Sequence, residues 1–170
     1  KVTDAKNVQQ AGDIVTKAAG KVPSVVVDDF SLLVENTVTE LEKIHSFGDM
    51  WRKLRHQVLF MRDAARYATS KGTHVFFNCH QAPPKVSSGK QVRGGPKLPG
   101  QLPEQFSAFA DVVARAEYEE TAAPWKYILR TGPDPDYIAG DRLGVLPDPA
   151  PMNLREALLA AGYNLPRPKG

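Results

Sequence analysis

The sequence predicts an α/β fold with a mainly parallel sheet. Two observations carry this expectation. Residues 24–33 read SVVVDDFSLL, a β-branched run that ends in two adjacent aspartates, and residues 73–79 read THVFFNC, a second apolar run of strand length. Helical patterns fill the chain between these runs. The order of strand, helices and strand is typical of a parallel pair joined by a crossover.

The composition favours a single globular domain with a sizeable core, because the chain has 170 residues, of which 42% are hydrophobic and 24% charged. A net charge of +3 permits contact with nucleic acid without requiring it. The single cysteine, Cys79, excludes an intrachain disulfide and cysteine-rich zinc modules, which suits a cytoplasmic protein. No apolar run approaches the roughly 20 residues of a membrane helix, so no membrane partner is expected.

The first predicted helix spans residues 4–19, where apolar side chains recur with helical spacing and Gly20 follows. Pro23 then stands at the entry of a predicted strand over residues 24–28, a position that tolerates its missing N–H. Because this strand is apolar on both faces, we expect it to be central in the sheet.

Two helices are predicted next, a short one over residues 33–43 and a long one over residues 49–70. Asp49 is a suitable N-cap for the long helix, and Gly72 ends it. Its apolar stripe consists of Trp51, Leu54, Val58, Met61, Ala65 and Ala68. A second buried strand over residues 73–79 follows.

Residues 80–103 contain five prolines and four glycines, and they predict a long loop without helix or strand. After this loop the pattern predicts a helix over residues 101–109. Two more strands are expected over residues 110–118 and 125–131, followed by turn chemistry in the TGPDPD segment.

The C-terminal part predicts a last helix over residues 153–161, with Asn153 as its cap, and a loose tail NLPRPKG. We therefore expect residues 1–150 to form the core, with the loop 81–103 inserted in it. Residues 151–170 add the helix and the tail.

The paired carboxylates of Asp28 and Asp29 are the leading candidates for chemistry. A carboxylate at the end of a parallel strand can hold Mg²⁺ through its waters, while its neighbour orients an attacking water. The alternative is that the strand ends in a solvated Asp-Asp turn.

The second strand ends in polar residues, since Asn78 and His80 lie two positions apart and share a face. Such side chains can sense a γ-phosphate by hydrogen bonding, or His80 can simply cap a loop. Cys79, between them, reads as a buried small residue rather than a nucleophile.

The long loop is basic, and it has no acidic residue before Glu104. Its cations can follow a phosphate backbone, although the loop has no aromatic side chains for base stacking, and a solvated loop without a ligand is the alternative. The cations are Lys85, Lys90, Arg93 and Lys97.

Arg142 stands between Gly140 and Gly144, shortly after a predicted strand. An arginine on a tight turn can reach the phosphates of a neighbouring subunit, as arginine fingers do, but an ordinary turn with a surface arginine has the same sequence.

Together these segments resemble the RecA-like ATPases of phages, the nucleotide-binding proteins of the Sak-type single-strand-annealing group, and more distantly RecA and RadA. The matching segments are VVVDDFSLL at 25–33, HVFFNCH at 74–80, GPKLPGQLPEQFSAFADVVARAEY at 95–118 and KYILRTGPDPDYIAGDRLG at 126–144. The resemblance implies a RecA-like three-layer sandwich, in which a mainly parallel sheet lies between layers of helices. It also implies that the protein binds ATP and Mg²⁺, binds single-stranded DNA, forms homo-oligomers and acts in recombination or annealing. For a phage-encoded protein the compartment is the host cytoplasm.

On this resemblance Asp28 takes the Walker B position and binds magnesium, and Asp29 accompanies it. His80 is the sensor, with Asn78 beside it, and the loop after His80 contacts DNA. Arg142 resembles the arginine of the K-N-R-F-G type motif in RadA, with Gly140 in place of its lysine.

The sequence departs from this family in one respect, because no G-x-x-x-x-G-K-[ST] phosphate loop occurs in it. The sheet is therefore expected to be incomplete at its N-terminal side, which leaves the strand over residues 73–79 with an unpaired edge. Either the chain is the second part of a longer ATPase, which a first residue other than methionine favours, or it is a degenerate copy that serves as a binding or assembly module. A third hypothesis is a metal-dependent nuclease that uses Asp28, Asp29 and Asp111.

Overall fold

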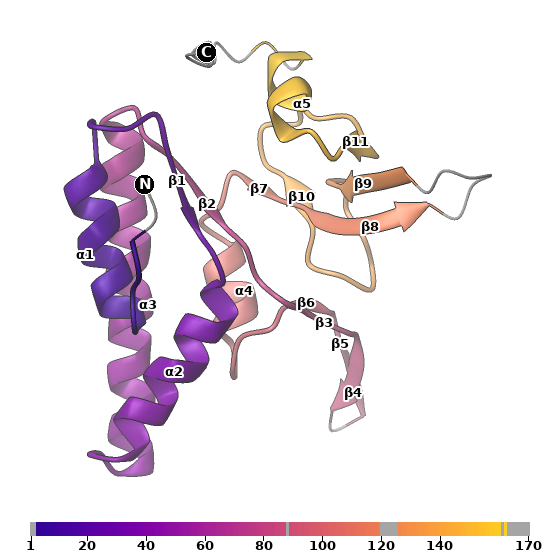
Figure 1. Ribbon diagram of the computed structural model, residues 1–170. Coiled ribbons are helices and arrows are strands. Elements are labelled where there is room, and N and C mark those ends of the chain that lie inside the picture. The colour runs from indigo at the N-terminus through magenta and orange to yellow at the C-terminus, as the bar shows by residue number, and fades with distance from the viewer. Residues whose placement is uncertain (1–2, 88, 120–125, 161, 163–170) are drawn as a thin grey trace. The chain divides into compact units, whose positions relative to one another are not determined.

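The computed structural model describes residues 3–87, 89–119, 126–160 and 162 (Figure 1). The chain divides into two compact units. The first consists of the residues up to His80 together with Pro96–Phe106, and the second of Gln81–Gly95 together with the residues from Ser107 onward. The segment 96–106 therefore returns to the first unit after an excursion into the second.

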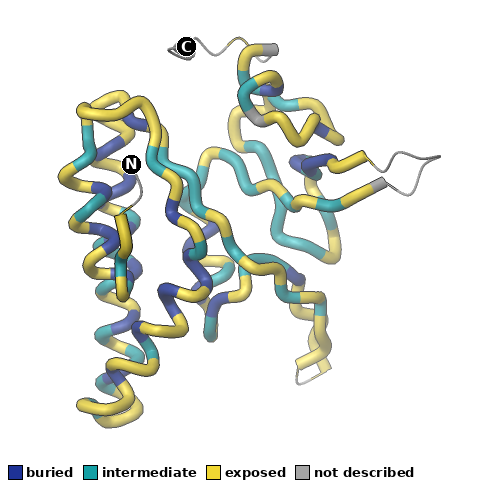
Figure 2. The backbone as a smooth tube through the Cα atoms, in the orientation of Figure 1, coloured by how far each residue is buried: buried dark blue, intermediate teal, exposed yellow. Residues whose placement is uncertain are grey.

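Three helices dominate the first unit: α1 (Val8–Ala18), α2 (Phe30–Glu42) and α3 (Phe47–Ser70). Helix α1 begins after Asn7, whose side chain accepts a hydrogen bond from the backbone N–H of Gln10 at 3.0 Å. Buried residues follow the faces on which the helices pack (Figure 2). On α3 they are Met50, Leu54, Val58, Met61, Ala64, Ala65 and Ala68. This confirms the predicted stripe from Leu54 to Ala68, but Met50 and Ala64 are added to it and Trp51 is only half-buried.

The bounds of these helices differ from the predicted ones at their N-termini. Helix α3 begins at Phe47, two residues before Asp49, which lies in its first turn and accepts a hydrogen bond from Arg52 instead of capping the helix. Helix α2 begins three residues earlier than predicted, directly after Asp29.

The predicted parallel pair is confirmed. Strand β1 (Ser24–Val27) pairs in parallel with β2 (His74–Phe77), with Val27 opposite Phe77. The two strands form a two-stranded sheet, so within the described residues β2 has no second neighbour. The expectation that β1 is buried on both faces is wrong, since the side chain of Val26 is 57% exposed.

An aromatic cluster packs next to this pair of strands. The rings of Phe30 and Phe77 meet edge to face with centroids 5.2 Å apart, and Phe106 stacks on Phe30 at 4.5 Å. Phe106 comes from α4 (Leu102–Ser107), a helix that confirms the one predicted over residues 101–109. Because Phe30 follows Asp29 and Phe77 precedes Asn78, the cluster fixes the ends of β1 and β2 relative to one another.

The second unit is built mainly from short antiparallel strands. A hairpin pairs β4 (Lys85–Ser87) with β5 (Lys90–Val92), with Gly89 at φ 73° in the turn. Its flanking strands are β3 (Gln81–Ala82) and β6 (Gly95–Pro96). The prediction of a loop without strands over residues 80–103 is therefore wrong.

The rest of the second unit contains a three-stranded sheet in the order β11–β9–β8, formed by Ala150–Pro151, Lys126–Arg130 and Arg115–Glu119, and a two-stranded pair of β7 (Val112–Val113) with β10 (Gly140–Asp141). Helix α5 (Leu154–Ala160) follows. A small core of Leu129, Ala150 and Ala157 joins this helix to the sheet. The predicted tail NLPRPKG and the last residue of the predicted helix lie outside the described residues.

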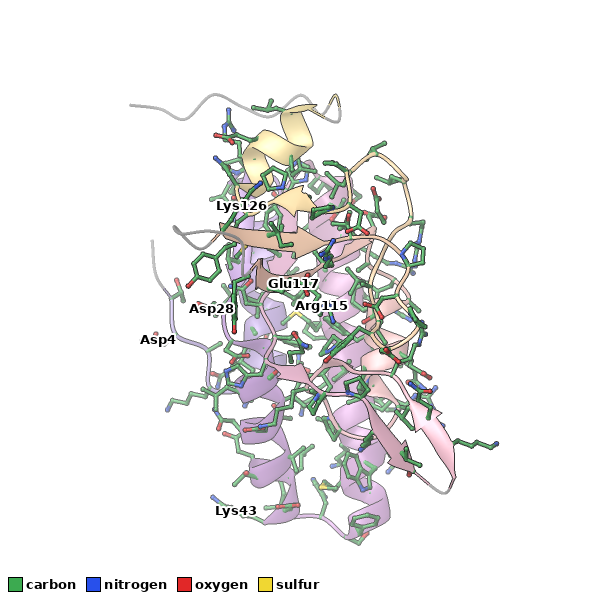
Figure 3. The ribbon with its side chains drawn as sticks, turned by 90° about the vertical axis from the view of Figure 1, so that its right-hand side faces the viewer. Asp4, Asp28, Lys43, Arg115, Glu117 and Lys126 are labelled. Atoms are coloured by element: carbon green, nitrogen blue, oxygen red, sulfur yellow. The ribbon has the colours of Figure 1, made fainter. Side chains whose placement is uncertain are left out.

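Charged side chains tie the three-stranded sheet to the turn that follows it. The guanidinium of Arg115 lies 2.7 Å from Glu117 on the same strand and 4.1 Å from the ring centroid of Tyr137, and Figure 3 shows Arg115 and Glu117 side by side. Glu117 also accepts a hydrogen bond from Arg130 on β9 at 2.5 Å. These contacts are internal to the unit and stabilise its fold.

The predicted three-layer sandwich with a mainly parallel sheet is contradicted. Strands β1 and β2 pair in parallel, whereas β4–β5, β7–β10, β8–β9 and β9–β11 pair antiparallel, and each sheet in the described residues has two or three strands. The physical reason is that a parallel neighbour requires a crossover of a dozen or more residues. After β2 the chain instead reverses through short turns rich in glycine and proline, which join antiparallel strands.

Within the part of the chain that the structure describes, no helix has the length and apolar character needed to cross a membrane.

Candidate functional site

The candidate site lies at the carboxyl ends of β1 and β2. Parallel pairing in register brings the residues that follow the two strands to the same edge. The backbone confirms this alignment, because Asn78 N–H donates to the carbonyl of Val27 at 3.0 Å and Phe30 N–H donates to the carbonyl of Asn78 at 2.8 Å. Asp28, Asp29, Asn78 and His80 are therefore neighbours, as the strand ends predict.

Asp29 uses both carboxylate oxygens within the fold. Oδ1 accepts hydrogen bonds from the backbone N–H groups of Ser31 at 2.7 Å and Leu32 at 3.4 Å, which caps α2. Oδ2 lies 2.8 Å from Nε2 of His80. The Asp29 side chain is 20% exposed and that of His80 is 66% exposed, so the carboxylate is anchored while the imidazole reaches solvent.

The backbone of His80 is fixed from two sides. Its N–H donates to Oγ of the buried Ser31 at 3.0 Å, and its carbonyl accepts a hydrogen bond from Lys97 N–H at 2.7 Å. The peptide position of His80 therefore depends on α2 and on the returning segment 96–106. Sequence reasoning missed Ser31, although an Asp-x-Ser pattern at a helix start is a recognisable capping signal.

Asp28 is the carboxylate that remains accessible. The residue is exposed at the end of β1 (Figure 3), and its Oδ1 accepts a hydrogen bond of 3.3 Å from the amide nitrogen of Asn78. This single long contact leaves most of the acceptor capacity of Asp28 free. Asn78 presents its donor to Asp28, which orients the carboxylate at the strand edge.

Asp28 is the accessible carboxylate that this site could offer to a hydrated magnesium ion. Mg²⁺ in nucleotide sites keeps several waters and takes only one or two protein carboxylates, with phosphate oxygens completing the shell. The described residues contain no group of three histidine, cysteine or carboxylate side chains placed to hold a metal. Asp28 would therefore bind the ion weakly unless a phosphate ligand shares it.

Cys79 is half-buried between the exposed residues Asn78 and His80. Burial raises the pKa of its thiol to about 11, against smaller opposing effects from its hydrogen bond with Ser31. A thiol with a raised pKa is a poor nucleophile, which agrees with the expectation that Cys79 is not a nucleophile, although the residue is half-buried rather than buried as predicted.

The four predicted DNA-contacting cations do not form one group. Lys85, Lys90 and Arg93 are exposed on or beside the β4–β5 hairpin, named here the basic hairpin (residues 85–93). Because Ser87 lies opposite Lys90, and Ser87 and Lys85 share a face, the two lysines project from the same face of the hairpin. Gln91, on the other face, donates to Asp136 at 2.7 Å and ties the hairpin to its unit.

Lys97 is separate from the basic hairpin, since it belongs to the first unit. Its ammonium lies 3.1 Å from the carboxylate of Glu35 on α2. This ion pair helps to dock the returning segment, so the charge of Lys97 is partly neutralised.

Arg142 follows β10 in the second unit, where its guanidinium donates to the carbonyl of Ala108 and its backbone N–H to that of Asp111 at 2.8 Å. A role toward the phosphates of a neighbouring subunit requires the guanidinium to exchange the Ala108 carbonyl for phosphate. The residue before it, Asp141, organises the turn through hydrogen bonds from the N–H groups of Leu143, Val145 and Leu146.

The nuclease hypothesis requires three carboxylates free to bind metal. Asp29 does not meet this requirement because both of its oxygens are engaged by α2 and His80. Asp111 lies before β7 in the second unit.

No protein-family model matches the chain, and comparison with curated proteins and with solved structures gives no significant match.

Proposed function

We propose that the chain is a phage-type nucleotide-binding protein of DNA recombination or single-strand annealing, working in the cytoplasm, with ATP and magnesium at the ends of β1 and β2 and single-stranded DNA on the basic hairpin. The observation that carries the proposal is the accessible carboxylate of Asp28, which accepts a hydrogen bond from Asn78, next to Asp29, whose carboxylate holds His80. An oxygen ligand for Mg²⁺ and two hydrogen-bonding side chains at one strand edge suit the terminal phosphate of a nucleotide.

The contacts suggest a separate role for each residue of the site. Asp28 would share a hydrated magnesium ion with the phosphates. His80, held by Asp29 through Nε2, would contact a phosphate oxygen through Nδ1, which donates a hydrogen bond when the imidazole carries both protons. Because the sequence has no glycine-rich phosphate loop, these residues supply only part of a nucleotide site, and weak binding is expected.

Titration with a fluorescent ATP analogue tests the nucleotide half of the proposal. Binding is expected to require magnesium and to be lost in Asp28→Asn, which keeps the shape of the side chain but removes its charge. Asp13→Asn, which removes an exposed carboxylate on α1, is the matched control and is expected to bind like the parent. Binding that is indifferent to magnesium and to Asp28→Asn would contradict the assignment.

The DNA half rests on the shared face of Lys85 and Lys90. Phosphate contacts by lysine release counterions, so each contact contributes about 0.7 to the slope of log affinity against log salt for single strands. Fluorescence anisotropy with labelled oligothymidylate is expected to show a shallower slope in Lys85→Ala and Lys90→Ala. Lys21→Ala, an exposed lysine of the first unit, controls for the loss of one charge. Equal slopes in all variants would argue against a DNA contact at the hairpin.

The alternative function is a binding or assembly module that uses the same fold without catalysis. One observation favours it: the carboxylate of Asp29 caps α2 and contacts His80, and both of these roles are structural. A melting temperature that does not change with magnesium and ATP, together with a stable interaction partner, would support this alternative.

A homo-oligomer remains part of the proposal, with the exposed turn around Arg142 as the contact to test. Sedimentation of the parent and of Arg142→Ala, with and without DNA, measures whether this residue contributes to self-association.

A further inference from the structure

Two exposed tyrosines are neighbours on the three-stranded sheet of the second unit. Tyr118 on β8 is directly opposite Tyr127 on β9, in an antiparallel pair of strands (Figure 1). Tyr118 is 48% exposed and Tyr127 is 61% exposed. Directly opposite residues of such a pair point to the same face, with Cβ atoms about 5 Å apart. The two strands therefore place two aromatic side chains next to each other at the surface of the unit.

The two faces of this sheet have different environments. One face carries Arg115, Glu117 and Arg130, which form ion pairs with one another. Because side chains alternate along a strand, the tyrosines lie on the opposite face. Helix α5 covers that face at Leu129, but the tyrosines remain exposed. Ala116, the next residue along β8 on the tyrosine face, is small and exposed, so a flat group has room beside the Tyr118 ring on that side.

The basic hairpin belongs to the same unit, and it contacts the same short segment as β8. Gln91 of the hairpin donates to Asp136 at 2.7 Å. The guanidinium of Arg115 on β8 lies 4.1 Å from the ring centroid of Tyr137, the next residue of that segment. From Arg115 the strand reaches Tyr118 within three residues, or about 10 Å. Contacts inside one unit therefore hold the tyrosines and the basic hairpin in place.

The chemistry of the tyrosines complements that of the basic hairpin. Residues 81–95 contain three cations, no acidic residue and no aromatic residue. No ion pair within the described residues involves Lys85, Lys90 or Arg93. Proteins that bind single strands combine cations, which follow the phosphates, with aromatic side chains on which bases stack. The hairpin has the cations without the rings, and the tyrosines supply the rings.

We propose that Tyr118 and Tyr127, named here the tyrosine pair, form a platform on which bases of single-stranded DNA stack while the basic hairpin binds phosphates of the same strand. This inference rests on the proposed DNA function and adds a second element to its binding site. Every base has a π-face, so the platform is expected to tolerate different sequences. The three unpaired cations in the same unit favour a polyanion over an apolar protein surface as the ligand.

Fluorescence anisotropy with the full chain tests the platform separately from the phosphate contacts. Labelled oligothymidylate is compared with an abasic deoxyribose-phosphate oligomer of the same length, which has the phosphates but no bases. Tyr118→Ala and Tyr127→Ala are each expected to weaken binding of oligothymidylate about tenfold and to leave binding of the abasic oligomer unchanged. Stacking on a neutral side chain releases no counterions, so the salt slope of these variants is expected to equal that of the parent.

Two kinds of variant serve as controls. Tyr118→Phe and Tyr127→Phe keep the ring, so they are expected to keep the binding of oligothymidylate. Tyr67→Ala removes a tyrosine of the first unit that is also 48% exposed, and it is expected to bind like the parent. Thermal unfolding reports whether each alanine variant keeps its fold. A loss of binding confined to the oligomer with bases, at an unchanged melting temperature, is not expected from a purely structural role.

The outcomes separate the platform from the DNA function on which it rests. Binding of oligothymidylate that depends on Lys85 and Lys90 but not on the tyrosine pair would overturn the platform and leave the DNA function standing. An equal loss of binding to both oligomers in the alanine variants would also overturn it. If the alanine variants keep DNA binding but lose self-association in sedimentation, the tyrosine pair is a protein interface instead. Absence of binding to either oligomer would refute the DNA function and the platform together.

Discussion

The imidazole Nε2 of His80 lies 2.8 Å from Oδ2 of Asp29, and the other oxygen of the same carboxylate caps helix α2. One side chain therefore joins the end of β1, the start of α2 and the residue that leaves β2. This relationship explains why the polar edge of the parallel pair is ordered although the sheet has only two strands.

Substitutions of Asp29 distinguish its role as the cap of α2 from its contact with His80. Asp29→Ala removes the cap and the contact with His80, and it is expected to lower the free energy of unfolding by about 1–2 kcal/mol. Asp29→Asn keeps a capping oxygen and loses only the charge opposite a largely exposed imidazole, so its cost is expected to be below about 1 kcal/mol. Urea denaturation measures both. Asp28→Ala, at an exposed position, is the control, and an equal loss there would refute the special role of Asp29.

Gly94 is predicted to contribute to the stability of the second unit, because its position has no room for a side chain. Its N–H donates to the carbonyl of Asp136 at 2.8 Å, and its carbonyl accepts from Ile138 N–H at 2.7 Å. A Cβ at this position would lie 2.6 Å from the backbone oxygen of Ala82 and 2.6 Å from the Tyr137 ring.

Gly94→Ala is therefore expected to lower the free energy of unfolding by about 1–3 kcal/mol, because a backbone atom must move. Gly140→Ala is the matched control in the same unit, since a Cβ there has open space around it. Equal unfolding midpoints of the two variants in urea would show that the close approach at Gly94 carries no cost.

The turn after β10 is predicted to weaken at low pH. Burial alone would raise the pKa of Asp141, but hydrogen bonds from the backbone N–H groups of Leu146, Leu143 and Val145 outweigh it and hold the pKa below its usual 3.8. A lowered pKa means that the charged form is favoured in the folded state. The stabilisation is therefore present above pH 3.8 and is lost as the pH falls through the folded-state pKa.

Comparing the parent with Asp141→Asn as a function of pH measures this contribution. The difference in free energy of unfolding is expected to be constant near neutral pH and to shrink at acidic pH, where the parent loses the same charge. Asp13→Asn controls for the removal of one surface carboxylate. A difference that stays constant down to acidic pH would refute the role of the Asp141 charge.

The sequence allowed the location of the polar edge to be predicted, but not how its residues are used. Asp28 and Asn78 were expected to be neighbours because they end two runs of strand length, and the register of β1 and β2 confirms it. The predicted start of α2 is three residues late, because periodicity alone does not fix the boundary between a strand and a helix that follows it within two residues. Asp29 was therefore not recognised as a cap.

Contacts between residues far apart in the sequence could not be predicted from local sequence patterns. The packing of Phe106 on Phe30 brings segment 96–106 back to the first unit, and no local pattern links two phenylalanines so far apart in the sequence. The basic hairpin had a turn signal at Gly89, but its strands are short and exposed, so the alternation of apolar and polar residues that marks a half-buried strand is missing. The expectation of a larger parallel sheet rests on the single pair of β1 and β2, and this pair is the part that the structure confirms.

Cys79 provides a test of how tightly the strand ends are packed. Burial raises the pKa of its thiol from 9.0 to about 11, so at pH 8 the thiolate fraction falls from about a tenth to about a thousandth. Alkylation by iodoacetamide at this pH is therefore expected to be about a hundredfold slower in the folded protein than in urea. The thiolate is the nucleophile, and Cys79 is the only thiol, so mass spectrometry follows the reaction without ambiguity. Similar rates in both conditions would mean that Cys79 is accessible, and the packing between Ser31 and the end of β2 would then be open to solvent.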